Sequence, residues 1–213
     1  MARFSIDEAK NYGGSNSTFF SLKDDKESAN VRFLLNDIND LKGVTVHEVE
    51  ENGAKYDVEC LRTYSEPVDN CPLCAAGYKL NAKVFIPLYN EDKQESQIWT
   101  RGKTYLDKID GLCSHYRPLV GTPFEIERHG KKGDTNTTYE MYPGRPDKST
   151  LQDFPEIQIE GNAFQIKTFD EMNNFLDTGT FDANRKQPVR AVNSTRQVPI
   201  RRTPTRTNEE DNF

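Results

Sequence analysis

Residues 44–74 read VTVHEVEENGAKYDVECLRTYSEPVDNCPLC, which places one histidine and three cysteines at the spacing His47-x12-Cys60-x10-Cys71-x2-Cys74. Thiolate sulfur and imidazole nitrogen are the ligands of structural zinc, which takes four of them in a tetrahedron. A shell of three cysteines and one histidine is closed and leaves no open position for catalysis. The stretch therefore predicts one structural zinc ion, held by His47, Cys60, Cys71 and Cys74.

The same stretch has the pattern of a β-hairpin. Asn52-Gly53 separates two alternating runs, and this dipeptide is strongly favoured in hairpin turns. A two-residue loop pairs His47 with Val58 and leaves Cys60 one diagonal away, whereas a four-residue loop pairs His47 directly with Cys60. Either even loop length puts both ligands on one face, because side chains alternate with a period of two. Cys71 and Cys74 would then supply two ligands from the following loop.

Cys113 is the rival fourth ligand. It falls on the apolar face of a predicted helix, where an ordinary buried cysteine is expected, so we favour His47. The alternative for the whole cluster is a buried strand histidine beside unpaired thiols. A thioredoxin-like redox role for Cys71 and Cys74 is not favoured, because no βαβ unit surrounds them.

Hydrophobic periodicity predicts a mainly β protein with a few short helices. Strands are expected over 31–35, 44–50, 55–62, 83–89, 97–101, 124–128 and 137–142, and helices over 5–12, 102–116 and 168–176. Short strands in this number, with one helix inserted before the last hairpin, favour an OB-fold-like barrel, and an SH3-like barrel would look similar. We expect a flexible N-terminal arm (1–20), a core (21–180) that includes a zinc subdomain (about 44–80), and a disordered tail (181–213).

Charge is distributed unevenly along the 213 residues. The net charge is −6, yet residues 183–208 hold seven Lys/Arg and no acid, so residues 1–182 carry −10. An acidic body argues against nucleic-acid binding in general and leaves room only for a local basic groove. The chain contains no apolar run near 18 residues and Met1–Lys10 has no signal-peptide core, so we expect a cytoplasmic protein with no membrane partner.

The ligand pattern resembles that of the zinc-containing single-stranded-DNA-binding proteins of tailed bacteriophages, the helix-destabilising type of T-even phages. The resemblance covers His47 to Cys74 well, the strand order to about Tyr142 loosely, and the acidic C-terminal tip. It implies an OB fold with a zinc subdomain, and a location in the host cytoplasm. Two departures stand out: residues 1–20 hold only Arg3 and Lys10 where the family has a basic arm, which puts cooperative binding in doubt, and the stretch before the tip is rich in arginine.

Sequence-tolerant binding of single strands needs a positive groove and aromatic platforms for bases. The residues that interleave these features are Arg32, Lys83, Tyr89, Trp99, Arg101, Lys103, Tyr105, Arg117, Arg128, Lys131, Lys132 and Tyr139. Alternation puts Gln97, Trp99 and Arg101 on one face, which is a candidate platform. The competing interpretation is that the large aromatics belong to the core.

The C-terminal tip combines acidic side chains with an apolar ring, in Glu209, Glu210, Asp211 and Phe213. It resembles the tips by which single-strand binders recruit replication and recombination enzymes, and a merely solubilising tail is the alternative. The basic run 185–206 would either add phosphate contacts or hold the acidic tip back.

These features together predict a non-catalytic protein that coats single-stranded DNA in phage replication, recombination and repair. The alternative is a zinc-stapled protein-interaction module or transcription cofactor. An enzyme is not expected, because Asp107 and Asp110 read as a solvated helix face and His115 and His129 have no recognisable partners. No phosphate-cradling loop, zinc-protease motif or nucleophile elbow is present.

Overall fold

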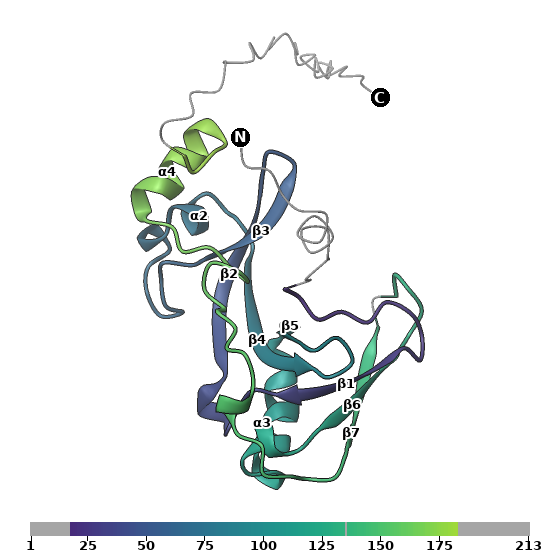
Figure 1. Ribbon diagram of the computed structural model, residues 1–213. Helices are drawn as coiled ribbons and strands as arrows, with labels where there is room; N and C mark the ends of the chain where they lie inside the picture. Colours follow the sequence, from purple (N-terminus) through teal and green to yellow (C-terminus); the bar gives the residue numbers. More distant parts are fainter. Residues whose placement is uncertain (1–17, 135, 183–213) are drawn as a thin grey trace, which may run out of the picture.

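Seven antiparallel strands form one sheet in the computed structural model, which describes residues 18–134 and 136–182 (Figure 1). The strands are β1 (Ser28–Phe33), β2 (Lys42–Glu51), β3 (Ala54–Glu59), β4 (Leu80–Asn90), β5 (Glu95–Gly102), β6 (Phe124–His129) and β7 (Thr138–Pro143). The helices are α2 (Pro72–Ala75), α3 (Leu106–His115) and α4 (Phe169–Thr178), with 3-10 turns η1 (Ile38–Asp40), η2 (Val68–Asn70), η3 (Lys103–Tyr105), η4 (Leu119–Gly121) and η5 (Leu151–Asp153). The expected mainly β class is confirmed. The helix expected over 5–12, most of the arm and the tail lie outside the described residues.

The long strand β4 organises the sheet, whose order is β3-β2-β4-β1-β6-β7 with β5 also on β4. β5 runs along residues 83–90 of β4, so β2 (paired at 80–85) and β1 (paired at 88–90) share its other edge. All seven predicted strands are present within a few residues of their expected bounds. Among the described residues, the pairings do not include one that closes the sheet into a barrel.

The β2–β3 hairpin has the two-residue loop of the two alternatives. His47 pairs with Val58, and Glu51 pairs with Ala54 across the turn. Asn52 and Gly53 have φ angles of 54° and 79°, the left-handed values that a type I′ turn requires at both central positions. The register therefore puts His47, Val58 and Cys60 on one face of the hairpin.

The main core lies between β4, β5, β1 and β6 and is covered by α3. Val84, Ile86 and Leu88 of β4 point into it together with the fully buried Trp99 of β5. Phe85 points to the opposite face, where it belongs to a smaller cluster beneath the segment that joins β7 to α4. Its ring centre lies 5.3 Å from that of Phe164. Strand β4 is therefore buried on both faces.

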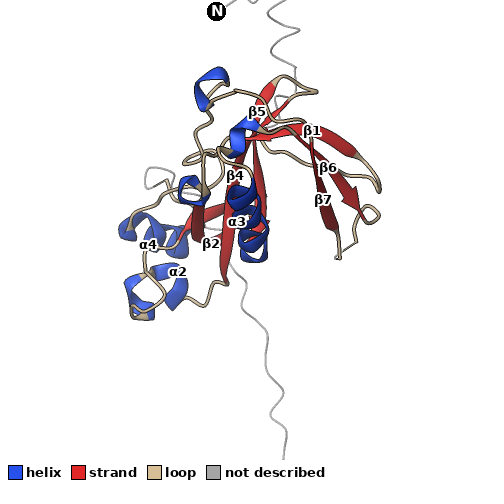
Figure 2. Cartoon of the chain, turned by 90° about the horizontal axis from the view of Figure 1, so that it is seen from below, coloured by secondary structure: helices blue, strands red, loops and turns tan. Residues whose placement is uncertain are grey.

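A second unit, which we call the metal lobe, comprises residues 44–80 and 165–182. Its small core joins Cys60 and Cys71 to Met172 and Phe175 of α4. Figures 1 and 2 both place α2 and α4 side by side, at the end of the molecule away from β6 and β7. Helix α4 begins at the predicted capping box of Thr168 and Glu171 and ends at Gly179, whose φ is 78°. None of the described helices combines the length and apolar character needed to cross a membrane.

Candidate functional site

His47, Cys60, Cys71 and Cys74 form one buried cluster, in which the four possible ligand atoms lie within 4.8 Å of one another. His47 comes from β2, Cys60 follows β3, Cys71 is the N-cap of α2 and Cys74 lies within this helix. Pro72 begins this helix, where its fixed φ is already helical and no backbone N–H is required. Strand pairing and one helical turn thus bring together ligands that are 27 residues apart in the chain.

The imidazole of His47 is oriented by the backbone. Its Nδ1 lies 3.3 Å from the carbonyl oxygen of Lys79, and a carbonyl can only accept, so Nδ1 carries the proton. Burial lowers the pKa of His47 and favours the neutral ring. The lone pair is then on Nε2, which lies 3.6 Å from the Cys71 sulfur and 3.4 Å from the Cys74 sulfur. This is the arrangement of a metal-binding histidine held by a partner on its other nitrogen.

The separations between the ligand atoms fit a tetrahedral ion. Zn–S and Zn–N distances of about 2.3 and 2.0 Å correspond to about 3.8 Å between two sulfurs and about 3.5 Å between sulfur and nitrogen. The sulfurs of Cys60 and Cys74 lie 3.6 Å apart, which is far beyond a disulfide, and all four cysteines are free. The buried cluster is therefore compatible with a structural metal ion such as zinc.

The surroundings of the three ligand sulfurs differ: donor groups lie beside Cys71 and Cys74, whereas burial without a metal opposes the thiolate form of Cys60. Burial acts to raise the pKa of Cys71, but backbone N–H groups of Cys74 and Leu61 act in the other direction, and the net pKa is lowered. Burial raises the pKa of Cys60 to about 12. The Nε of Arg62 lies 3.1 Å from the Cys74 sulfur, and its other nitrogen donates to the carbonyl of Glu66 at 3.1 Å. Arg62 thus places a positive charge beside the thiols and holds the loop that precedes Cys71.

Cys113 is not part of this cluster. It lies on α3 in the main core, almost fully buried, where burial raises its pKa to about 11. The expected choice of His47 over Cys113 therefore agrees with where the structure places the two side chains.

A second cluster brings Arg101 together with three aromatic rings. Its guanidinium carbon lies 4.4 Å from the ring centre of Trp99, 5.5 Å from Tyr105 and 4.1 Å from Tyr139. Desolvation lowers the pKa of Arg101, and within the described residues it makes no ion pair. Its Nε and the Nε1 of Trp99 are both buried without a hydrogen-bond partner in this part of the chain. A half-buried guanidinium that has no ion pair in this part of the chain makes the cluster suited to an anionic group.

Trp99 itself is fully buried and therefore offers no face for a base. This position agrees with the competing interpretation, in which the large aromatics belong to the core: the face that Trp99 shares with Arg101 is the core face of β5, and Arg101 is half-buried. The expected role of Trp99 as a stacking platform stays a prediction. Tyr139 is 7% exposed, and Tyr105 is half-buried. Lys108, which the sequence reasoning missed, extends the cluster, with its Nζ 5.3 Å from the Tyr105 ring.

Several predicted DNA-contact residues are committed to structural contacts. Arg32 is 8% exposed and binds Glu91 at 2.7 Å and Asp147 at 2.6 Å. Lys83 pairs with Asp57 at 2.6 Å. Arg32 and Lys83 thus each neutralise an acidic side chain of the fold, and their expected contacts with DNA stay predictions.

The remaining predicted contact residues are spread over the molecule. Tyr89 packs on Phe154, with ring centres 4.9 Å apart, and is not one of the rings around Arg101. Arg128 is 8% exposed and donates to the Tyr139 hydroxyl at 3.0 Å, so it supports the Arg101 cluster from beneath. Arg117 donates to the Cys113 carbonyl. Lys103, Lys131 and Lys132 are exposed. Glu209, Glu210, Asp211 and Phe213 lie outside the described residues.

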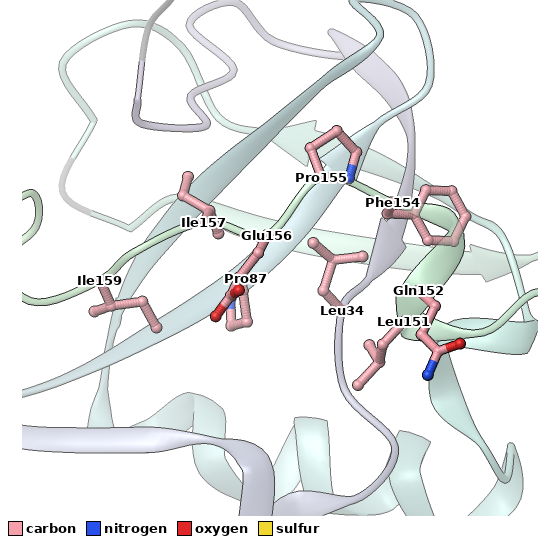
Figure 3. Close-up of a pocket in the computed structure, with 9 residues that line it drawn as sticks. All are labelled: Leu34, Pro87, Leu151, Gln152, Phe154, Pro155, Glu156, Ile157 and Ile159. Carbon is pink, nitrogen blue, oxygen red and sulfur yellow. The ribbon is translucent and has the colours of Figure 1, made fainter.

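A hollow of about 590 Å³ lies elsewhere, between β4 and the segment that precedes α4 (Figure 3). Its lining is mostly apolar, with Leu34, Phe154 and Ile157 among the side chains, and Glu156 is its one charged residue. A hollow of this character does not suit a phosphate backbone, and none of the predicted DNA-contact residues lines it.

Comparison with protein-family models and with curated proteins gave no match for this chain. The class of protein is therefore defined by its structure: a mainly β antiparallel sheet protein with a buried His/Cys3 cluster compatible with a metal ion.

Proposed function

We propose that this protein binds single-stranded DNA without catalysing a reaction, and that His47, Cys60, Cys71 and Cys74 hold one structural zinc ion. In the proposed role it coats exposed strands during replication, recombination or repair, and its acidic C-terminal tip recruits partner proteins. The proposal takes its ligand class from the Arg101 cluster and its biological setting from the phage resemblance of the ligand pattern and the tip. A finer fold assignment, the OB fold, belongs to the same proposal.

The observation that carries the proposal is the position of Arg101, whose guanidinium lies on aromatic rings and makes no ion pair within residues 18–134 and 136–182. A buried charge without a counter-ion is costly, so such a residue favours an anionic ligand. The exposed Lys103 and Lys108 follow it in the sequence, which adds positive charge at the same edge. Guanidinium on an aromatic surface is suited to both parts of a nucleotide, the phosphate and the base.

A titration with oligo-dT tests the proposal. Wild-type protein is expected to bind it more tightly than a duplex of equal length, with affinity falling steeply between about 50 and 200 mM salt. Trp99 is buried under Arg101, so its fluorescence should report displacement of the guanidinium when DNA binds. Arg101→Ala should weaken binding at least about tenfold, which is the scale of one lost charge-assisted contact. Lys55→Ala, an exposed cation on β3, is the control and should bind normally.

Equal affinity for duplex and single strand would contradict the proposal, as would binding that ignores salt. If oligo-dT does not bind, the result favours the second candidate function, a protein-interaction module. The exposed apolar side chains of the metal lobe support that function.

A further inference from the structure

Exposed apolar side chains gather on the metal lobe. Of the ten large hydrophobic residues that are exposed in the described part of the chain, seven belong to it: Leu61, Tyr64, Val68, Tyr78, Ile166, Phe169 and Leu176. The lobe holds only a third of the described residues. Apolar groups concentrated in this way mark a surface that contacts another polypeptide.

The same lobe carries most of the negative charge. Its 55 residues include eleven acids and four bases, a formal charge of −7, whereas the other 109 described residues carry −3. Phosphate backbones are repelled by such a surface. A surface that is both acidic and apolar is complementary to a basic peptide with apolar side chains.

Helix α4 presents the clearest face of this kind. Phe169 (47% exposed) and Leu176 (37% exposed) lie seven residues apart, two helical turns, and so share a side of the helix. Asp170 and Asp177 repeat the same spacing beside them, and neither makes an ion pair within residues 18–134 and 136–182. The adjoining side of α4 is occupied, because Met172 and Phe175 are buried against the ligand cluster, and Asp170 and Asp177 lie opposite that buried side.

We propose that the outer face of α4 binds residues 183–208 of its own chain. This segment carries seven bases and no acid, so its charge of +7 mirrors that of the lobe. It begins directly at the lobe, since Phe181 stacks on Phe175 with ring centres 4.4 Å apart and Asp182 follows it. Val198, Pro199 and Ile200 stand next to Arg201 and Arg202, an apolar group beside two cations that matches Phe169 and Leu176 beside Asp170 and Asp177.

The chain is long enough for this contact. Val198 lies sixteen positions after Asp182, and at about 3.3 Å per residue this stretch spans up to about 50 Å. Helix α4 itself is about 15 Å long. The binding is independent of the proposed DNA-binding role, because none of the residues of the Arg101 cluster belongs to the metal lobe.

Nuclear magnetic resonance on the full-length chain tests the proposal. Amide shifts of wild type are compared, at low salt, with those of a variant in which Arg190, Arg196, Arg201 and Arg202 are changed to Gln. We expect differences concentrated in residues 166–178 and lost in 1 M salt, where the screening length falls to about 3 Å. No difference in α4, or differences centred on another surface, would overturn the proposal.

A second variant tests the contact from the other side. The double change Phe169→Ser and Leu176→Ser should shift the signals of residues 196–202 toward those of the Arg-to-Gln variant. Leu106→Ser is the matched control, because Leu106 is equally exposed (38%) on α3, and it should leave these signals unchanged. Far-ultraviolet circular dichroism of the double variant and of Leu106→Ser should match that of wild type, which checks that the helices stay folded in both. Shifts that change with protein concentration would identify a second copy as the occupant and overturn binding within one chain.

Discussion

The sulfur of Met172 on α4 lies 3.9 Å from the sulfur of Cys71, although 101 residues separate them in the chain. Helix α4 is therefore packed directly against the ligand cluster, and the aromatic rings of Phe175 and Phe181 continue the contact. Glu51 of β2 completes it, accepting hydrogen bonds from the Thr180 hydroxyl and from the Phe181 backbone. The position of α4 and the state of the cluster are physically coupled.

Removal of the metal should release α4. Binding of an ion to ligands that are together only in the folded lobe stabilises that lobe, so chelation should remove the stabilisation. We expect hydrogen exchange in residues 167–181 to accelerate by at least about tenfold, an order-of-magnitude figure for loss of local stability. Peptides from β1 and α3, in the main core, serve as internal controls and should change little. Equal protection of α4 with and without chelator would contradict the coupling.

Cobalt substitution should identify the four ligands. A thiolate–cobalt spectrum is expected for wild type and for Cys113→Ser, because Cys113 lies in the main core. His47→Ala should distort or lose the spectrum, because it removes the one nitrogen ligand from a closed shell. The opposite pattern, with loss in Cys113→Ser alone, would show that the ligand set is wrong.

The sequence predicts local features well because strands and turns follow short-range rules. Alternation located all seven strands, Asn52-Gly53 located the hairpin, and the Thr168 capping box located α4. Together with metal-ligand spacing, these rules were sufficient to bring His47 and Cys60 to one face. The sequence did not decide between a two-residue and a four-residue loop, because either even loop length satisfied the same alternation.

Contacts between distant segments were not predictable in this way. Alternation correctly put Trp99 and Arg101 on one face, but it cannot tell the core face of a strand from the solvent face when both faces of its neighbour β4 are covered. Arg32 looked available, yet its partner Asp147 is 115 residues away. The role of Arg62 beside the ligand cluster was not predicted. The signal available in the sequence was a basic residue two positions after a ligand cysteine.

Arg62 should strengthen metal binding without being a ligand. Its Nε lies 3.1 Å from the Cys74 sulfur, and the pKa of Arg62 is raised chiefly by this hydrogen bond. Replacement of such an outer partner typically lowers metal affinity about 10–100-fold, and we expect this for Arg62→Gln. Competition against a chromophoric chelator measures the change. Lys79→Gln is the matched control, since Lys79 contacts His47 through its backbone carbonyl and its side chain is exposed. Equal losses in both variants would indicate a general charge effect.

Acid should weaken the fold through Asp147. The Arg32 guanidinium lies 2.6 Å from the Asp147 carboxyl and holds its pKa at about 2. The ordinary pKa of an aspartate in an unfolded chain is about 3.9. Because the folded pKa is the lower one, the stabilisation is complete above about pH 4 and is lost as the pH falls toward 2. Urea unfolding of wild type and Asp147→Asn between pH 2 and 6 should therefore show a stability difference that is constant at the upper end and vanishes at the lower end. Asp69→Asn, an exposed aspartate of the metal lobe, is the control. A difference that stays constant through pH 2 would mean that the ion pair does not contribute.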